Sequence, residues 1–418
     1  MKLENLGCLK CGGVLERSRD NVYHCKACGR SFSQNAMEKA AEEILREVLL
    51  QRISARNVQK TARNEEFYPT LDDYDTEKFK IENGVLAEYK KYLSNDEVVI
   101  PKGVTVIGVN AFNWSRMSNV IIPDGVISIE YGAFSNCLNL ARVELPPSVL
   151  TINEKAFDEC LELQEVFISC GVTEVKNDAF VNCPNLSSIV VDKRNARYSG
   201  VGNCLIEKSS QTLILGCSDS VIPSDGSVTS IGDGAFAFSN IESVVIPDSV
   251  TSIGNQAFYM CEKLTNVTLG RNLTTIKKEA FYHCGSLADL TVKSARLGLV
   301  DYGVFLGCQN LVRIALPVGI TTLSRNLFNS SGLSEIIIPH GVTTIEEGVF
   351  FQCENLTNVQ IPASVRTIGR DVFNGCGNLR QISFDGTIAQ WNSIKISGDW
   401  HYRVPAKYVA CRNGYVPI

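Results

Sequence analysis

The chain has 418 residues, of which 44% are hydrophobic, enough apolar material to form the cores of several ordinary domains. Its charged fraction of 20% and its net charge of −5 are low for a protein devoted to nucleic acid, which is usually basic. No stretch approaches the roughly 18 consecutive apolar residues of a membrane-spanning helix, so the sequence gives no reason to expect a membrane protein.

The first 60 residues differ from the rest, because they hold 11 Lys and Arg against 7 Asp and Glu. They also contain two close pairs of cysteines in the pattern C-x₂-C-x₁₃-C-x₂-C, namely Cys8, Cys11, Cys25 and Cys28. Four thiolates in two pairs match tetrahedral zinc, and the glycine after each pair lets the backbone turn tightly. With no further ligand nearby, we expect a closed, structural Zn²⁺ site in a zinc ribbon spanning residues 1–34.

Residues 35–62 have the pattern of an amphipathic helix. Asn35 can cap it, with Glu38 three residues later. An apolar stripe at helical spacing follows, made of Ala41, Ile44, Leu45, Val48 and Leu49. The stripe either packs on a neighbouring part of the chain or mediates oligomerisation. Residues 63–78 are predicted to be an acidic linker.

Phenylalanine then recurs at nearly constant spacing over about 260 residues. Its positions are Phe112, Phe134, Phe157, Phe180, Phe236, Phe258, Phe281, Phe305, Phe328, Phe350 and Phe373. The steps are 22 to 24 residues, apart from one step of 56. A fixed period of this size is typical of a solenoid, in which each turn buries its apolar edge against its neighbours.

Each repeat reads approximately L-x-x-V-x-I-P-x-x-V-T-x-I-G-x-x-A-F-x-x-C-x-x-L. The segment L-x-x-V-x-I alternates every two residues and is rich in β-branched side chains, which predicts a strand. The proline after it cannot donate a ladder hydrogen bond and ends the strand. The segment A-F-x-x-C-x-x-L is predicted to form one helical or 3₁₀ turn with Phe and Leu inside.

Half of the 16 cysteines follow the repeat phenylalanine by three residues. They are Cys137, Cys160, Cys183, Cys261, Cys284, Cys308, Cys353 and Cys376, and the other three turns have Ser115, Ser239 and Ser331 there. The site therefore favours a small side chain that can face a backbone group. Because serine replaces cysteine in three turns, we expect a ladder of buried free thiols and not a set of disulfides, a redox centre or a metal site.

Units such as residues 246–264, I-P-D-S-V-T-S-I-G-N-Q-A-F-Y-M-C-E-K-L, resemble the BspA-like leucine-rich repeat of bacteria and some protists. The resemblance covers residues 79–418. Residues 79–100, with the turn signal Asn83-Gly84, resemble an opening hairpin cap, and residues 385–418 resemble a closing cap. The family resemblance implies a leucine-rich-repeat solenoid over residues 101–384. This solenoid would have a parallel β-sheet and short helical or 3₁₀ turns, about eleven turns in all.

The step of 56 residues predicts an insertion near residues 191–217. Two short apolar runs around residues 208–211 indicate a β-hairpin. The insertion is either a structural spacer or a protrusion specific to a partner.

No catalytic constellation is visible, since the four histidines are scattered and no nucleophile or phosphate-binding motif occurs. We therefore expect a non-catalytic scaffold that binds a protein or peptide. In a leucine-rich repeat, the strand residues that flank the central aliphatic face outward on the sheet. The candidates are Ile121, Arg142, Glu144, Glu165, Phe167, Val190 and Val245, and the apolar members are predicted to form a strip. Strand propensity alone is the competing explanation.

Two other functions remain open at this point. Residues 1–60 have the basic excess and the zinc ribbon of some nucleic-acid-associated proteins. Many BspA-like proteins are cell-surface or secreted adhesins, but here the first residues lack the apolar core of an export signal. We accordingly expect a cytoplasmic protein.

Overall fold

A computed structural model describes residues 14–18, 22–28, 30–33, 69–91, 93 and 97–418. The chain divides into two units, residues 1–68 and 69–418, and each is described separately. Cys8, Cys11, the expected helix over residues 35–62 and the first part of the expected linker lie outside the described residues.

The first unit contains a small antiparallel sheet in the order β1-β2-β3. Its strands are β1 (Leu15–Arg17), β2 (Val22–Cys25) and β3 (Ser31–Ser33). Leu15 pairs with Cys25, and Tyr23 pairs with Phe32. Leu15, Tyr23 and Cys25 are buried, so even this short sheet has an apolar side.

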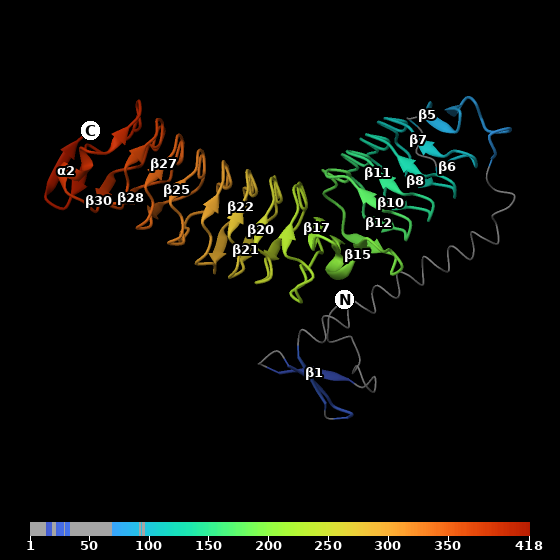
Figure 1. The fold of residues 1–418 in the computed structure, drawn as a ribbon, viewed down its shortest axis with the longest axis horizontal. Helices are drawn as coiled ribbons and strands as arrows, with labels where there is room; N and C mark the ends of the chain where they lie inside the picture. The colour runs from blue at the N-terminus through green and yellow to red at the C-terminus, as the bar shows by residue number, and fades with distance from the viewer. Residues whose placement is uncertain (1–13, 19–21, 29, 34–68, 92, 94–96) are drawn as a thin grey trace. The chain divides into compact units, whose positions relative to one another are not determined.

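The second unit is a parallel β-solenoid of about 14 turns, more than the eleven expected from phenylalanine spacing (Figure 1). Counting phenylalanines omits the turns in which another residue takes the ring position. Tyr89 packs on Phe112 at the start of the array, and Trp400 packs on Phe373 at its end. The inserted residues near 200–217 add a further turn.

Most turns carry one long and one short strand. The long strands form the long-strand sheets, in the orders β6-β8, β10-β12-β14, β19-β21-β23 and β26-β28-β30-β32-β33. Their bounds are β6 (Glu97–Val99), β8 (Asn119–Ile121), β10 (Arg142–Glu144), β12 (Glu165–Ile168), β14 (Ser188–Val191), β19 (Ser243–Val245), β21 (Asn266–Leu269), β23 (Asp289–Val292), β26 (Glu335–Ile337), β28 (Asn358–Ile361), β30 (Gln381–Phe384), β32 (Tyr408–Cys411) and β33 (Gly414–Pro417).

The short strands form the opposite side of each turn. Their sheets have the orders β13-β11-β9-β7-β5-β4, β15-β16-β17-β18-β20-β22-β24 and β25-β27-β29-β31. Their bounds are β4 (Phe79–Glu82), β5 (Val85–Tyr89), β7 (Val106–Ile107), β9 (Ser128–Ile129), β11 (Thr151–Ile152), β13 (Glu174–Val175), β15 (Tyr198–Ser199), β16 (Leu205–Glu207), β17 (Thr212–Leu215), β18 (Ser230–Ile231), β20 (Ser252–Ile253), β22 (Thr275–Ile276), β24 (Leu299–Val300), β25 (Thr322–Leu323), β27 (Thr344–Ile345), β29 (Thr367–Ile368) and β31 (Lys395–Ile396).

The repeat phenylalanines stack into a column along the core. Ring centroids of successive turns lie 4.9 to 5.7 Å apart, and the rings are within 11° of parallel. In each stacked pair the backbone sets this spacing, because the amide of one phenylalanine donates to a carbonyl of the next turn. The amide of Phe134, for example, donates to the carbonyl of Ala156 at 2.7 Å. The spacing matches that of adjacent β-strands.

The segment around each phenylalanine does not form the helical or 3₁₀ turn expected from the sequence. It is instead a series of separate turns, and left-handed residues interrupt it on both sides of the ring. Around Phe157 these residues are Lys155 (φ 55°) and Glu159 (φ 57°). Helix in the described residues is confined to α2 (Ile388–Trp391) and η2 (Val201–Asn203). These helices are too short to span a lipid bilayer.

The eight repeat cysteines form the buried ladder of free thiols expected from the sequence. Each thiol donates to the carbonyl of the phenylalanine one turn earlier, with sulfur–oxygen distances of 2.9 to 3.2 Å. Burial raises the pKa of these thiols where a shift is resolved, and raises that of Cys353 to about 11. A protonated thiol is a poor nucleophile, so the ladder is chemically inert.

The insertion forms a turn of its own instead of a protruding arm. β16 and β17 pair antiparallel, and β17 continues in parallel with β18 of the next turn. Gly216 takes the place of the repeat phenylalanine, because its amide donates to the carbonyl of Ala235. A side chain at Gly216 would overlap the ring of Phe236, which occupies the space that a side chain here would fill.

We predict that Gly216→Ala destabilises the solenoid by about 1–3 kcal/mol, because the added methyl group must displace the buried Phe236 ring. Urea unfolding followed by circular dichroism measures the change. Gly285→Ala is the matched control, since nothing lies within 4 Å of its Cβ position. Equal midpoints for the two variants would contradict the packing described here.

We also predict that the solenoid loses stability as pH rises above 9. The pKa of Cys353 is raised from its ordinary value of 9.0 to about 11, so the folded form retains a proton that the unfolded form releases. The stabilisation is complete below pH 9 and falls by about 1 kcal/mol for this thiol between pH 9 and 10. Urea midpoints at these two pH values measure the loss, and Cys353→Ser should reduce it.

Candidate binding surface

The seven predicted partner-binding residues all lie on long strands, but they do not form one continuous strip. Ile121 is on β8, in the two-stranded sheet β6-β8. Phe167 and Val190 face each other across the β12–β14 pair. Val245 is on β19, which begins a separate sheet after the insertion. The insertion therefore separates Val190 from Val245 along the array.

The same residues differ sharply in exposure. Phe167 and Val190 are only 8% and 5% exposed, whereas Val245 is 63% exposed. An aspartate at Phe167 or Val190 would therefore place a charge in a buried site and test folding more than binding. Of the apolar candidates, Val245 is the one most accessible to a partner.

The charged candidates form a small ion-pair network. Arg142 lies between Glu165, with Nε 3.6 Å from Oε2, and Glu144, with a guanidinium nitrogen 3.9 Å from its Oε2. All three side chains are only about one-fifth exposed. Arg142 is the single cation between two carboxylates, so the network carries one net negative charge.

A more accessible surface lies on the last long-strand sheet, β26-β28-β30-β32-β33. The strand registers place Ile337, Gln360, Ser383, Ala410 and Tyr415 in one row on the same side of the sheet. Tyr408 lies on this side too, two residues before Ala410. We call this row together with Tyr408 the C-terminal sheet face. Ile337 is 68% exposed, Tyr408 51% and Tyr415 67%.

The two tyrosines are held at a defined angle to each other. Their ring centroids are 4.8 Å apart, with the rings at 70° in an edge-to-face contact. Both lie on the closing hairpin, in which Cys411 pairs with Gly414. The sequence contains a signal for this pair, because Tyr408 and Tyr415 flank a tight turn at Arg412-Asn413, with Gly414 directly after it. The resemblance to a closing cap does not by itself predict this exposed tyrosine pair.

Of the predicted zinc ligands, the structure describes Cys25 and Cys28. Cys25 is buried at the end of β2, and Cys28 is exposed in the turn that follows. The amide of Cys28 donates to the sulfur of Cys25 at 3.4 Å. In the described residues no three potential ligands cluster as a metal site would require, but Cys8 and Cys11 are not among those residues.

Comparison with known proteins identifies the repeat. Residues 87–202, 229–350 and 296–395 match the family described as the BspA type leucine rich repeat region, which is found in six copies. These ranges cover more than half of the chain. No curated protein matches the chain.

Several solved structures resemble the chain. A leucine-rich repeat protein from Bacteroides ovatus is 23% identical, with 78% of this chain and 96% of that one covered and a TM-score of 0.42. A leucine rich cell surface protein from Faecalibacterium prausnitzii is also 23% identical, with 77% and 97% covered and a TM-score of 0.41. The pneumococcal vaccine antigen PcpA is 17% identical, with 73% and 78% covered and a TM-score of 0.44.

Proposed function

Because the chain belongs to the BspA-type leucine-rich repeat family, we propose that it is a non-catalytic scaffold that binds a protein or peptide through its long-strand sheets. The observation that best supports this is the C-terminal sheet face, where Ile337, Tyr408 and Tyr415 are exposed on a regular sheet. Stacked turns hold the backbone beneath these side chains. A rigid surface loses little entropy when a partner binds.

The chemistry of this face fits a protein partner. Tyrosine offers a large apolar surface with a polar end and few rotatable bonds, and it is enriched at binding interfaces. Gln360 and Ser383 lie between the apolar ends of the row and add hydrogen-bonding groups without net charge. Val245, on β19, provides a second exposed apolar position.

Affinity capture with the intact protein, followed by mass spectrometry, tests the proposal. We expect Ile337→Asp or Tyr415→Ala to reduce the capture of a specific partner about tenfold or more, as loss of a central apolar anchor does. Val318→Asp is the matched control, because Val318 is 74% exposed but lies in a loop. Equal loss in all three variants, or in none, would reject the C-terminal sheet face as the site.

We also propose that residues 1–34 form a zinc ribbon in which Cys8, Cys11, Cys25 and Cys28 bind one structural Zn²⁺. Two observations support it. Cys25 and Cys28 sit at the end of β2 and in the next turn, and the amide-to-sulfur hydrogen bond between them is of the kind that stabilises a thiolate ligand. Zinc would contribute most of the folding free energy of so small a unit.

Zinc content and chelation test this second proposal. We expect one zinc per intact chain by elemental analysis, and we expect Cys25→Ser to lose it. Cys411→Ser is the control, because Cys411 belongs to the solenoid, on β32, and not to residues 1–34. A zinc content that is unchanged in Cys25→Ser, or absent from the wild-type protein purified without chelators, contradicts the proposal.

The thiol ladder supports a cytoplasmic location, which we propose on that ground. Eight buried free thiols suit a reducing compartment, since oxidising compartments favour disulfides. Fractionation of cells that produce the full-length protein is the direct measurement, and recovery in the secreted or surface fraction would overturn the proposal.

A further inference from the structure

The ladder of hydrogen bonds from the amides of the repeat phenylalanines is interrupted at Phe180. In a regular turn, amides on both sides of the phenylalanine and its own amide donate to carbonyls of the next turn, as Gly132, Phe134 and Asn136 do. The equivalent amides of Asp178, Phe180 and Asn182 have no such acceptor among the described residues. Phe180 is the one repeat phenylalanine of the eleven whose amide lacks this bond.

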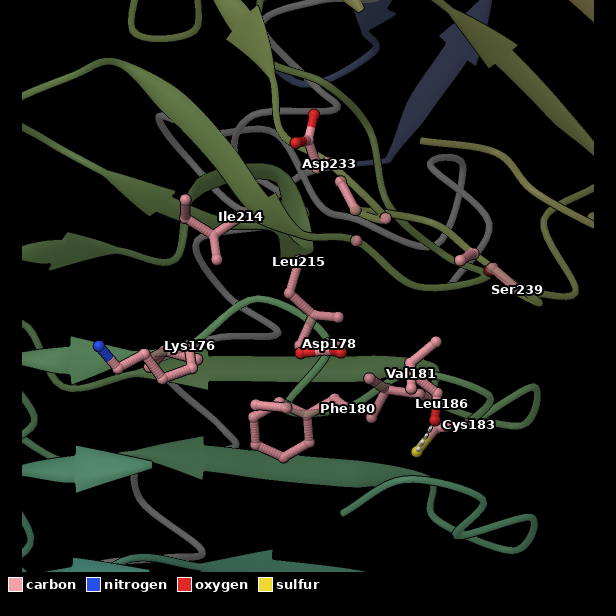
Figure 2. A pocket seen from close by; sticks show the side chains of 16 residues that line it. Lys176, Asp178, Phe180, Val181, Cys183, Leu186, Ile214, Leu215, Asp233 and Ser239 are labelled. Carbon is pink, nitrogen blue, oxygen red and sulfur yellow. Dashed lines mark hydrogen bonds between the residues drawn. The ribbon is translucent and has the colours of Figure 1, made fainter. Parts of the chain in front are cut away.

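A hollow lies where the missing hydrogen bonds would be (Figure 2). Phe180, Val181 and Cys183 line it from the earlier turn, and Leu215 and Asp233 line it from the later ones. The enclosed space is small, about 30 Å³. Leu215 still packs against the core cluster that contains Phe180, but none of the three amides around Phe180 donates to a backbone carbonyl across the hollow.

The core divides at the same place. The stacked ring column ends at Phe180 and begins again at Phe236. The buried residues form two clusters, one containing the phenylalanines up to Phe180 and the other containing those from Phe236 onward. The inserted hairpin contributes to both, because Leu205 packs in the first cluster and Cys204 and Ile206 pack in the second.

On the long-strand side the two parts stay connected. The side chain of Asn203 imitates a neighbouring strand: its Oδ1 accepts from the amide of Ile189 at 2.7 Å, and its Nδ2 donates to the carbonyl of Ser187 at 2.6 Å. The amide of Ser218 donates to the carbonyl of Leu186 at 3.0 Å. These contacts join the insertion to β14 and to Leu186, which also lines the hollow.

From these observations we propose that the solenoid has a hinge between Phe180 and Gly216. The two stacks move as rigid bodies about the Asn203 and Ser218 contacts, and the hollow opens and closes as they do. Such a pivot needs one side that is joined and one side that is held by fewer contacts. At the joint the amide ladder is broken on one side, where the hydrogen bond from the amide of Val175 to the Tyr198 hydroxyl remains. No other pair of successive phenylalanines among the described turns combines a broken ring stack with a broken amide ladder.

The hinge lies between Val190 and Val245, so it would change the relative position of the long-strand sheets on its two sides. A partner that contacts both sheets would favour one hinge angle and restrict the motion. The hinge itself does not depend on the proposed function, because it is defined and tested in the unbound protein.

Distance distributions from pulsed electron paramagnetic resonance test the hinge in the full chain. Spin labels on unnatural ketone side chains replace Glu162, Lys263 and Asn355, which are exposed and each follow a repeat phenylalanine by five residues. The Glu162–Lys263 pair spans the joint, and the Lys263–Asn355 pair spans the same number of turns without it. We expect the Glu162–Lys263 distance distribution to be at least about twofold wider than the Lys263–Asn355 distribution. Equal widths would overturn the proposal.

A pair of asparagine variants tests the pivot. Asn203→Ala removes both bonds to β14, so we expect it to widen the Glu162–Lys263 distribution and leave the Lys263–Asn355 distribution unchanged. Asn378→Ala is the control, because Asn378 also bridges to a neighbouring backbone, at the carbonyl of Glu354, but within the second stack. Circular dichroism establishes that each variant is folded. No widening in folded Asn203→Ala, or equal widening in the control, would rule out this pivot.

Discussion

The structure depends on one constraint, the hydrogen bond from the amide of a repeat phenylalanine to a carbonyl of the next turn, which ten of the eleven make. This bond holds successive turns near the spacing of adjacent strands, and every equivalent side chain then stacks on its counterpart. The phenylalanine column and the thiol ladder both follow from it. Phe134 stacks at 4.9 and 5.1 Å on the rings of its two neighbouring turns, which leaves little room for a change in the spacing between turns.

The same constraint separates stability from function. Core positions are nearly identical in every turn, and their polar groups are already used, as the thiols are in bonding to phenylalanine carbonyls. Recognition of a partner is therefore restricted to the outer faces, where neighbouring turns can have different residues at equivalent positions. On the last sheet, Ile337, Gln360, Ser383 and Tyr415 occupy one row with four different chemistries, while the buried residues beneath them remain aliphatic.

The ends and the joint are the places where the array cannot repeat. Tyr89 and Trp400 continue the ring column into the terminal turns, and Phe79 packs on Tyr89 beyond the first of them. At the joint, Gly216 supplies no ring, and side chains make hydrogen bonds that the backbone makes in other turns. The side-chain oxygen of Asn203 accepts from the amide of Ile189 on β14. The Tyr198 hydroxyl accepts from the amide of Val175 on β13. Strand edges left open in this way would otherwise invite association with other chains.

The sequence by itself determined the solenoid, its period, the inward phenylalanines and the inert thiols. These features depend on a local spacing of residues that recurs in every 22- to 24-residue repeat. Only the tertiary structure decided the number of turns, since Tyr89, Gly216 and Trp400 take the ring position without resembling phenylalanine in the pattern. It also decided which outward residues a partner can reach. Phe167 and Val245 have the same position in the repeat, yet Phe167 is buried and Val245 is exposed. The exposure of an outward side chain depends on the neighbouring side chains around it, which its position in the repeat does not specify.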